Sequence, residues 1–204
     1  VPVCIDTEGA QIRTGEFVRG QVEIRENTIV RVHPHRVPGD PFHFNLYPRA
    51  IVGEFKVGDF ASIDFDSVLV QVTGFEAENQ DRAVVMRVLN GGAIGSNKAV
   101  TVDRDIAMPP LTEKDRNSVQ IGLSLGVQHF ALSFANRVAD VHILRKLVGQ
   151  ESVIISKIEC LEGLRNLDSI ADASDALLID RGDLSRQVPI EKIPRLQKLI
   201  IHKA

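Results

Sequence analysis

The strongest constraint on the fold of this chain comes from two short apolar runs that each end in charged residues. Residues 154–158 read Ile-Ile-Ser-Lys-Ile and precede Glu159, and residues 176–179 read Ala-Leu-Leu-Ile shortly before Asp183. Such runs are typical of strands buried in a parallel sheet. Lys157 and Glu159, two residues apart, share one face of their strand. We therefore expect the two strands to bring Glu159 and Asp183 together, where two carboxylates can bind a divalent metal.

Strands and helices alternate in the last part of the chain. The apolar spacing predicts strands over 130–134, 153–158 and 176–179, and helices over 138–147, 161–173 and 192–202. Another helix is expected to begin at Thr112, because a hydroxyl followed by acidic residues is typical of a helix N-terminus. Repeating units of this kind indicate an α/β fold built on a parallel sheet or barrel.

Polar residues follow the ends of these expected strands. The first residues, 1–5, form an apolar run that also reads as a core strand and leads into Asp6 and Thr7. In α/β barrels the functional residues lie at the carboxyl ends of the strands. The candidates at these ends are Asp6, Ser133, Lys157, Glu159 and Asp183.

The pattern changes between about residue 14 and about residue 102. Short runs that alternate apolar and polar residues, such as 21–25 and 68–72, are separated by turn-forming clusters such as residues 38–41. This pattern predicts a small all-β domain. The expected organisation is a barrel strand in 1–14, an inserted all-β domain over 15–101, and a β/α segment over 102–204.

Composition narrows the class of protein. With 44% hydrophobic and 25% charged residues, the chain has the composition of a folded globular protein. Its apolar runs are far shorter than the roughly 20 residues of a membrane span, and no targeting signal is evident, so we expect a cytoplasmic protein without a membrane partner. A net charge of −3 without a long basic block argues against nucleic acid as a partner. Cys4 and Cys160 are better explained by a reducing compartment than by a disulfide scaffold.

Six motifs, in order along the chain, resemble those of pyruvate kinase. Residues 6–15 read D-T-E-G-A-Q-I-R-T-G, similar to the family's D-T-K-G-P-E-I-R-T-G, and residues 155–159 read I-S-K-I-E, similar to its I-x-K-I-E. The other matches are N-G-G-A-I-G-S-N-K at 90–98, L-T-E-K-D at 111–115, A-S-D-A and R-G-D-L between 173 and 184, and P-I-E-K-I at 189–193. Their shared order makes accidental similarity improbable.

The resemblance implies both a fold and a reaction. The fold is an α/β one, an incomplete TIM-type β/α barrel carrying a small all-β barrel lid domain that is inserted after the third barrel strand. The reaction is phosphoryl transfer from phosphoenolpyruvate to ADP, which gives pyruvate and ATP in glycolysis. By position, Glu159 and Asp183 would hold Mg²⁺ or Mn²⁺, and Lys157 would be the catalytic residue that stabilises the migrating phosphoryl group.

Further residues receive substrate-binding roles from the same resemblance. Ser133 and Phe134 would line the pocket, and the backbone amides of Gly182 and Asp183 would receive the substrate carboxylate. Lys157 would contact the substrate as well.

The resemblance also implies an ion site and a nucleotide site. Asp6 and Thr7 would supply part of a potassium site. Arg13 and the lid residue Lys98 would reach the phosphates of ADP or ATP. Because Gln11 stands where the family carries glutamate or lysine, a requirement for K⁺ stays open.

Three differences between this chain and the family pattern bear on activity. Asp180 replaces the family's alanine and places a carboxylate beside a pocket for an anionic substrate, where like charges about 4 Å apart repel by roughly 1 to 4 kcal/mol. Glu8 replaces a lysine and reverses a charge near the phosphate region. The family's first two and last two barrel strands have no counterpart here, so we expect a longer chain, a decayed protein or a partner that supplies them. In its full-length form the protein is expected to be a homo-oligomer.

Two alternative functions remain open at this point. A metal-dependent aldolase or lyase acting on pyruvate-type substrates would also use a metal held by a Glu and an Asp on successive strands. Asp180 slightly favours this reading, because a carboxylate there could serve a substrate of different charge. The other alternative is a non-catalytic pseudoenzyme of the pyruvate kinase family that keeps the fold without the chemistry.

Overall fold

The computed structural model describes residues 2–65, 67–78, 81–104 and 106–203, and Val1 of the expected opening strand lies outside them. The chain forms two compact units, one made of 1–10 and 108–204 and the other of 11–107. Within the described residues, none of the helices has the length and apolar character needed to span a membrane.

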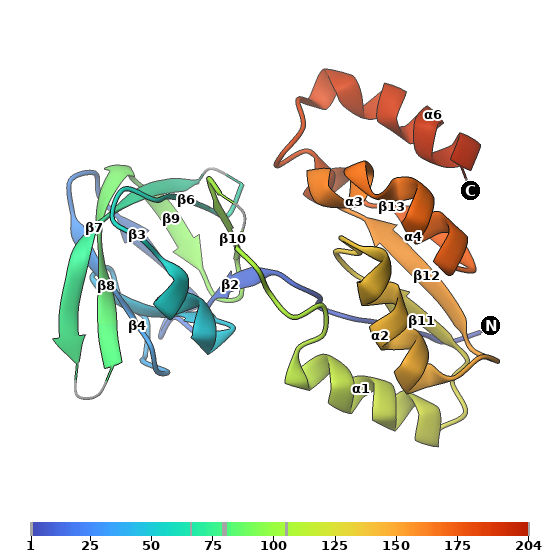
Figure 1. Ribbon diagram of the computed structural model, residues 1–204. Helices are drawn as coiled ribbons and strands as arrows, with labels where there is room; N and C mark the ends of the chain where they lie inside the picture. The colour runs from blue at the N-terminus through green and yellow to red at the C-terminus, as the bar shows by residue number, and fades with distance from the viewer. Residues whose placement is uncertain (1, 66, 79–80, 105, 204) are drawn as a thin grey trace. The chain divides into compact units, whose positions relative to one another are not determined.

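A parallel sheet of four strands forms the first unit (Figure 1). Its order is β1 (Cys4–Asp6), β11 (His129–Leu132), β12 (Val153–Ile158) and β13 (Ala176–Ile179). The register pairs Asp6 with Ala131, Leu132 with Ser156, and Ile158 with Ile179. Because all four strands run in the same direction, their carboxyl ends lie along one edge of the sheet.

Helices follow the strands, as the apolar spacing predicts. They are α1 (Glu113–Ser124), α2 (Val138–Val148), α3 (Leu161–Arg165), α4 (Leu167–Ala173), α5 (Arg181–Leu184) and α6 (Ile193–Lys203), with a short 3₁₀ turn at Ile190–Lys192. The α/β content is thereby confirmed. α2 and α4 pack against each other and against β12 (Figure 1).

The core of this unit lies between the sheet and its helices. Phe130, Leu132, Ile154 and Ile158 project from the strands and pack with residues of the helices, among them Leu144. Each is at most 1% exposed, and burying a side chain of this size stabilises a fold by about 1.5 to 3 kcal/mol. The apolar runs that predict the strands are therefore the residues that fix the sheet against its helices.

Two expected elements differ from the structure. The helix predicted over 161–173 is interrupted at Asn166, whose side-chain amide donates to the carbonyls of Asn136 and Glu162 at 2.8 and 3.2 Å. A side chain that bonds to backbone in this way competes with helix continuation. The strand predicted to reach Phe134 ends at Leu132, and Phe134 has a left-handed backbone with φ 51°.

The second unit, 11–107, contains a closed barrel of strands in the order β10, β2, β5, β4, β8, β7, β6. These strands are β2 (Ile12–Thr14), β4 (Ile29–His33), β5 (His43–Tyr47), β6 (Phe60–Ile63), β7 (Val68–Glu78), β8 (Asp81–Asn90) and β10 (Ala99–Val102). The pair β3 (Gln21–Ile24) and β9 (Gly92–Gly95) and a 3₁₀ helix at Arg49–Glu54 complete the unit. The expected small all-β barrel is confirmed.

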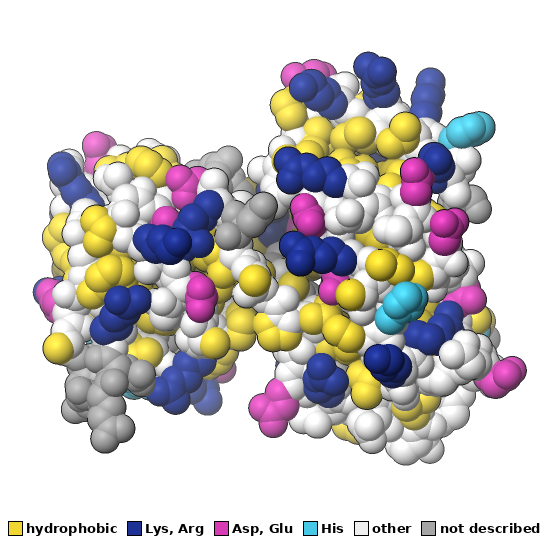
Figure 2. Space-filling model, viewed as in Figure 1, with side chains coloured by type: hydrophobic (Ala, Val, Ile, Leu, Met, Phe, Trp, Pro, Cys, Tyr) yellow, Lys and Arg dark blue, Asp and Glu magenta, His cyan; other side chains and the backbone are white. Residues whose placement is uncertain are grey.

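The barrel closes around alternating apolar residues. Val30 and Val32 of β4 and Val70 and Val72 of β7 are at most 1% exposed. Residues between them, such as Arg31, lie on the outside, where Arg31 pairs with Glu76 at 2.7 Å. On the face of the molecule in Figure 2, acidic and basic side chains are interspersed with apolar ones.

Candidate active site at the carboxyl edge of the parallel sheet

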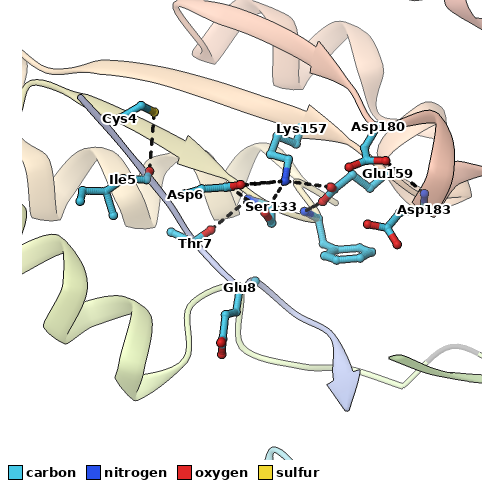
Figure 3. A network of polar contacts seen from close by, with 12 residues as sticks. Cys4, Ile5, Asp6, Thr7, Glu8, Ser133, Lys157, Glu159, Asp180 and Asp183 are labelled. Carbon is cyan, nitrogen blue, oxygen red and sulfur yellow. Dashed lines mark hydrogen bonds and ion pairs between the residues drawn. The ribbon is translucent and has the colours of Figure 1, made fainter. Parts of the chain in front are cut away.

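Lys157 is the centre of a polar network at the carboxyl ends of β1, β11 and β12 (Figure 3). Its Nζ lies 3.1 Å from Glu159 Oε1 and 3.3 Å from Asp6 Oδ2, and it donates to Ser133 Oγ at 3.0 Å. The side chain of Lys157 is 12% exposed. Burial lowers the pKa of Lys157, but the charges of Glu159 and Asp6 outweigh burial and hold that pKa above its ordinary value. The ammonium group therefore stays charged at neutral pH.

Glu159 is the most buried carboxylate of the site, at 1% exposure. Its Oε2 accepts the backbone N–H of Phe134 at 2.6 Å, a contact that the left-handed backbone of Phe134 makes possible. Its Oε1 lies 3.1 Å from Lys157 Nζ, so the ammonium group is the partner of this oxygen. Burial raises the pKa of Glu159, against the opposing effects of the Phe134 amide and Lys157.

Three carboxylates meet beside Lys157. One oxygen each from Glu159, Asp180 and Asp183 lies within 4.8 Å of the others. The expectation that Glu159 and Asp183 lie together is confirmed. Asp183 does not follow β13 directly, because the chain turns into α5 at Asp180 and carries Asp183 in that short helix. Carboxylate oxygens at this spacing suit a hard divalent cation such as Mg²⁺.

Asp180 makes contacts that the motif comparison did not anticipate. It is the N-cap of α5, and its Oδ1 accepts the backbone N–H groups of Gly182 and Asp183 at 3.0 and 3.2 Å. These are the two amides expected to receive a substrate carboxylate. Asp183 itself pairs with Arg186 at 2.6 Å.

Hydrogen bonds connect the carboxyl end of β1 to that of β11. Thr7 Oγ1 accepts the backbone N–H of Ser133 at 3.0 Å, and Ser133 Oγ donates to Asp6 Oδ1 at 3.2 Å. Asp6 and Thr7 therefore lie at the site, where Asp6 faces the Lys157 ammonium. The next turn requires Gly9, with φ 71°, because a Cβ there would lie 2.5 Å from the carbonyl oxygen of Ser133.

Asp115 holds the chain segment that follows β1, a role that the L-T-E-K-D motif does not indicate. Its Oδ1 accepts the N–H of Glu8 at 2.6 Å, and its Oδ2 accepts the N–H of Gly9 at 3.2 Å. The same Oδ2 accepts the N–H and hydroxyl of Thr112 at 2.9 and 2.8 Å, as part of a capping box on α1. The T-x-x-D pattern predicts the cap, but no sequence signal links Asp115 to residues more than 100 positions away. Glu8 points to Lys114 and forms an ion pair with it.

Arg13 and Lys98 belong to the second unit, 11–107. Arg13 Nη1 donates to the carbonyl of Asn97 at 2.9 Å, and Lys98 Nζ lies 3.0 Å from Asp64 Oδ2. The two residues lie on neighbouring chain segments, because Arg13 in β2 pairs with Ala99 in β10. Their predicted contact with nucleotide phosphates stays a prediction.

Comparison with known proteins adds evidence independent of the geometry. The family model described as pyruvate kinase, barrel domain, matches residues 1–204. The pyruvate kinase of Geobacillus stearothermophilus is 34% identical over 208 residues, which cover 100% of this chain and 35% of the relative. The pyruvate kinase of Clostridium acetobutylicum is 32% identical over 209 residues, covering 100% of this chain and 43% of the relative.

The chain thus spans 35 to 43% of the length of these two relatives. The match extends over residues 1–204 and so includes the segments that carry Lys157, Glu159 and Asp183. On this evidence the chain belongs to the pyruvate kinase family.

Proposed function

We propose that this chain carries part of the active site of a pyruvate kinase-like phosphotransferase, which transfers a phosphoryl group from phosphoenolpyruvate to ADP in glycolysis. The observation that supports the proposal best is the buried pair of Lys157 and Glu159 beside Asp183. A cation and carboxylates gathered at one sheet edge match the needs of phosphoryl transfer, which depends on positioning and charge stabilisation.

The fold is proposed to be an incomplete TIM-type β/α barrel with an inserted lid over 15–101, flanked by 1–14 and 102–204. In support, the parallel sheet of the described residues has β1 and β13 as its edges and is not closed. A barrel needs further strands to pair with those edges. The longer relatives have chain length for such strands, so the full-length protein is proposed to supply them.

Glu159 and Asp183 are proposed to hold Mg²⁺ or Mn²⁺. The fit rests on the chemistry of the donor set, because carboxylate oxygens of Glu159 and Asp183 lie within 4.8 Å of each other and the side chain of Glu159 is buried. When bound, the ion supplies positive charge that polarises phosphoryl and carboxylate oxygens. Asp6 and Thr7 are proposed to contribute to a K⁺ site.

Lys157 is proposed to be the catalytic residue. Its pKa is held above the ordinary lysine value, so it keeps its proton and offers a fixed positive charge to the phosphoryl oxygens. Ser133 orients it by accepting a hydrogen bond from Nζ. Phe134 is proposed to line the substrate pocket, and its N–H holds Glu159 in place.

The remaining binding roles are proposals as well. The amides of Gly182 and Asp183 are proposed to receive the substrate carboxylate once Asp180 moves away from them. Arg13 and Lys98 are proposed to bind the phosphates of ADP and ATP. The full-length protein is proposed to be a cytoplasmic homo-oligomer that acts on these small molecules.

Pyruvate release from phosphoenolpyruvate and ADP, measured on the full-length protein, tests this function. The Lys157→Met variant should lose at least about 100-fold in kcat, the usual effect of removing one stabilising group. Lys146→Met, which removes an exposed lysine of α2, is the matched control and should keep full activity. Wild-type turnover no higher than that of Lys157→Met would contradict the proposal.

Two further measurements separate the alternatives. Pyruvate formed from oxaloacetate without ADP would identify a lyase instead. Titration with Mn²⁺, phosphoenolpyruvate and ADP reports binding directly, and absence of saturable binding would identify a pseudoenzyme. Glu159→Gln should weaken Mn²⁺ binding at least tenfold, because it removes the charge of the most buried carboxylate.

A further inference from the structure

We propose that His33 and His43 form a binding site for a divalent transition metal such as Ni²⁺ or Cu²⁺ on the outer surface of the barrel in the second unit. Both residues lie within 11–107, and neither belongs to the group of carboxylates at the edge of the parallel sheet. The site is therefore independent of the proposed function.

The two histidines project from neighbouring strands to the outside of the barrel. β4 and β5 run parallel, and their register pairs Val32 with Phe44. Val32 and Phe44 are 0% and 1% exposed and belong to the core. His33 follows Val32 and His43 precedes Phe44, so both imidazoles lie on the opposite face of the strands, where they are half-buried.

The ring nitrogens of this pair have the spacing of two ligands of one metal ion. His33 Nε2 is 2.9 Å from His43 Nδ1, and the ring centroids are 5.2 Å apart. With metal–nitrogen bonds of about 2.0 to 2.1 Å, two nitrogens at this separation subtend roughly 90° at the metal. Neighbouring ligands make that angle in the square-planar and tetragonal coordination of Cu²⁺ and Ni²⁺. The metal takes the place of the proton in the hydrogen bond between the two nitrogens and releases that proton to water.

Hydrogen bonds fix the backbone that carries the two rings. Asp40 Oδ1 accepts the N–H of His43 at 2.7 Å, and the carbonyl of His43 accepts the N–H of Asp40 at 2.8 Å. His33 lies in β4, which pairs with β5 on one side and with β8 on the other. Metal binding therefore needs only rotation of the two rings, and its cost in chain entropy is small.

The charges beside the two rings also suit a cation. Arg31 is the residue opposite His43 in the register, and its guanidinium donates to Glu76 at 2.7 and 3.0 Å, so its positive charge is compensated. Hydrogen bonds from Arg31 hold the pKa of Glu76 below its ordinary value, and positive charge on His43 and His33 acts in the same direction. The Glu76 carboxylate is therefore near enough to both rings to attract a cation between them.

Calorimetric titration of the full-length protein with Ni²⁺ tests this site. Excess Mg²⁺ is present throughout, because Mg²⁺ prefers carboxylate oxygens and leaves imidazole nitrogens to Ni²⁺. His33→Gln and His43→Gln should each lower the affinity for Ni²⁺ at least about tenfold, since each variant removes one of the two protein ligands. With Cu²⁺ in place of Ni²⁺, electron paramagnetic resonance should show coupling to two imidazole nitrogens in wild type and to one in either variant.

Three variants serve as controls. His142→Gln removes an exposed histidine of α2 in the first unit and should leave the Ni²⁺ affinity unchanged. Glu159→Gln, which alters the carboxylate site, should also leave it unchanged, so the proposed function and this metal site are tested separately. The ring centroid of His35 lies 5.6 Å from that of His33, and His35→Gln should weaken binding less than loss of either ligand.

Equal Ni²⁺ affinity in wild type, His33→Gln and His43→Gln would overturn the proposal, as would a wild-type protein that binds no Ni²⁺ in excess Mg²⁺. A larger loss in His35→Gln than in both ligand variants would overturn the assignment of the ligands. If one ligand variant does not fold, the other decides, because each alone removes half of the pair.

Discussion

Lys157 Nζ lies 3.1 Å from Glu159 Oε1, and the two residues are separated along the chain only by the fully buried Ile158. Lys157 is in β12 and Glu159 directly follows that strand, so continuation of the extended chain places the two side chains on the same face. The side chains are 12% and 1% exposed. The charge of each is therefore compensated mainly by the other, with Asp6 beside Lys157 and the Phe134 amide beside Glu159.

Removing the cation of this pair should destabilise the fold. Lys157→Met leaves Glu159 buried without its partner, and breaking a buried ion pair in this way costs about 3 to 5 kcal/mol. Urea denaturation at pH 7 measures the loss. The loss should shrink at lower pH, where Glu159 takes up a proton, and the Lys157→Met/Glu159→Gln double variant should recover part of it. A loss that is equal at every pH contradicts the explanation.

Asp115 should support the turn after β1. The Asp115→Asn variant keeps one accepting oxygen where the carboxylate has two, so the N–H groups of Glu8, Gly9 and Thr112 cannot all keep their acceptor. We expect a loss of about 2 kcal/mol, the usual cost of an unsatisfied buried polar group. Hydrogen exchange should accelerate at Glu8 or at Gly9, whichever amide faces the new NH₂ group instead of the remaining oxygen. Unchanged protection of both amides would show that Asp115 does not hold this turn.

Gly9 and Gly126 form a matched pair for testing close packing at the site. Both have positive φ, at 71° and 75°, so alanine at either position costs about 1 to 2 kcal/mol of backbone strain. Only at Gly9 would the new Cβ meet another group, the Ser133 carbonyl oxygen at 2.5 Å, while nothing lies within 4 Å of a Cβ at Gly126. Gly9→Ala should therefore lower the free energy of unfolding by clearly more than Gly126→Ala. Equal losses would mean that the turn can move away from β11.

The ion pair of Asp59 and Arg104 should make the stability of the second unit depend on pH. Hydrogen bonds from Arg104, at 2.9 Å, hold the pKa of Asp59 below its ordinary value, against the opposing effect of burial. A pKa lower in the folded than in the unfolded state means that this stabilisation is present above the unfolded pKa, about 3.9, and is lost as the pH falls through the folded pKa. The contribution should be about 2 kcal/mol, typical of a hydrogen bond between charged groups.

Tyr47 gives a readout for that effect, because it is the single Tyr of a chain without Trp and it lies in β5 of the second unit. Urea denaturation followed by Tyr47 fluorescence from pH 7 to pH 2 should show the loss in wild type. Asp59→Asn should be less stable at pH 7 and less dependent on pH. A wild-type curve parallel to that of Asp59→Asn would rule the effect out.

Much of the fold could be predicted from local patterns. The strands over 153–158 and 176–179 match β12 and β13 residue for residue, because a short apolar run with turn-forming flanks specifies a strand. The expected burial of the second run is wrong, because β13 has only β12 as a neighbour among the described strands and leaves Leu178 40% exposed. The helix over 161–173 could not be predicted correctly, because its interruption at Asn166 depends on a bond to Asn136, a residue distant in sequence. The same holds for Phe134, whose left-handed backbone directs its N–H to Glu159, a residue distant in sequence.

The sequence by itself determined the alternation of strands and helices, the all-β character of the middle segment, and the adjacency of Lys157 and Glu159, since each follows from periodicity along a short stretch of chain. Only the tertiary structure decided which partners these groups have. It brought Asp6 to Lys157 and Asp115 to Glu8 across more than 100 residues. It also turned Asp180 onto the amides of Gly182 and Asp183. Hydrogen bonds and ion pairs depend on distance in space, and that distance is set by how the strands and helices pack.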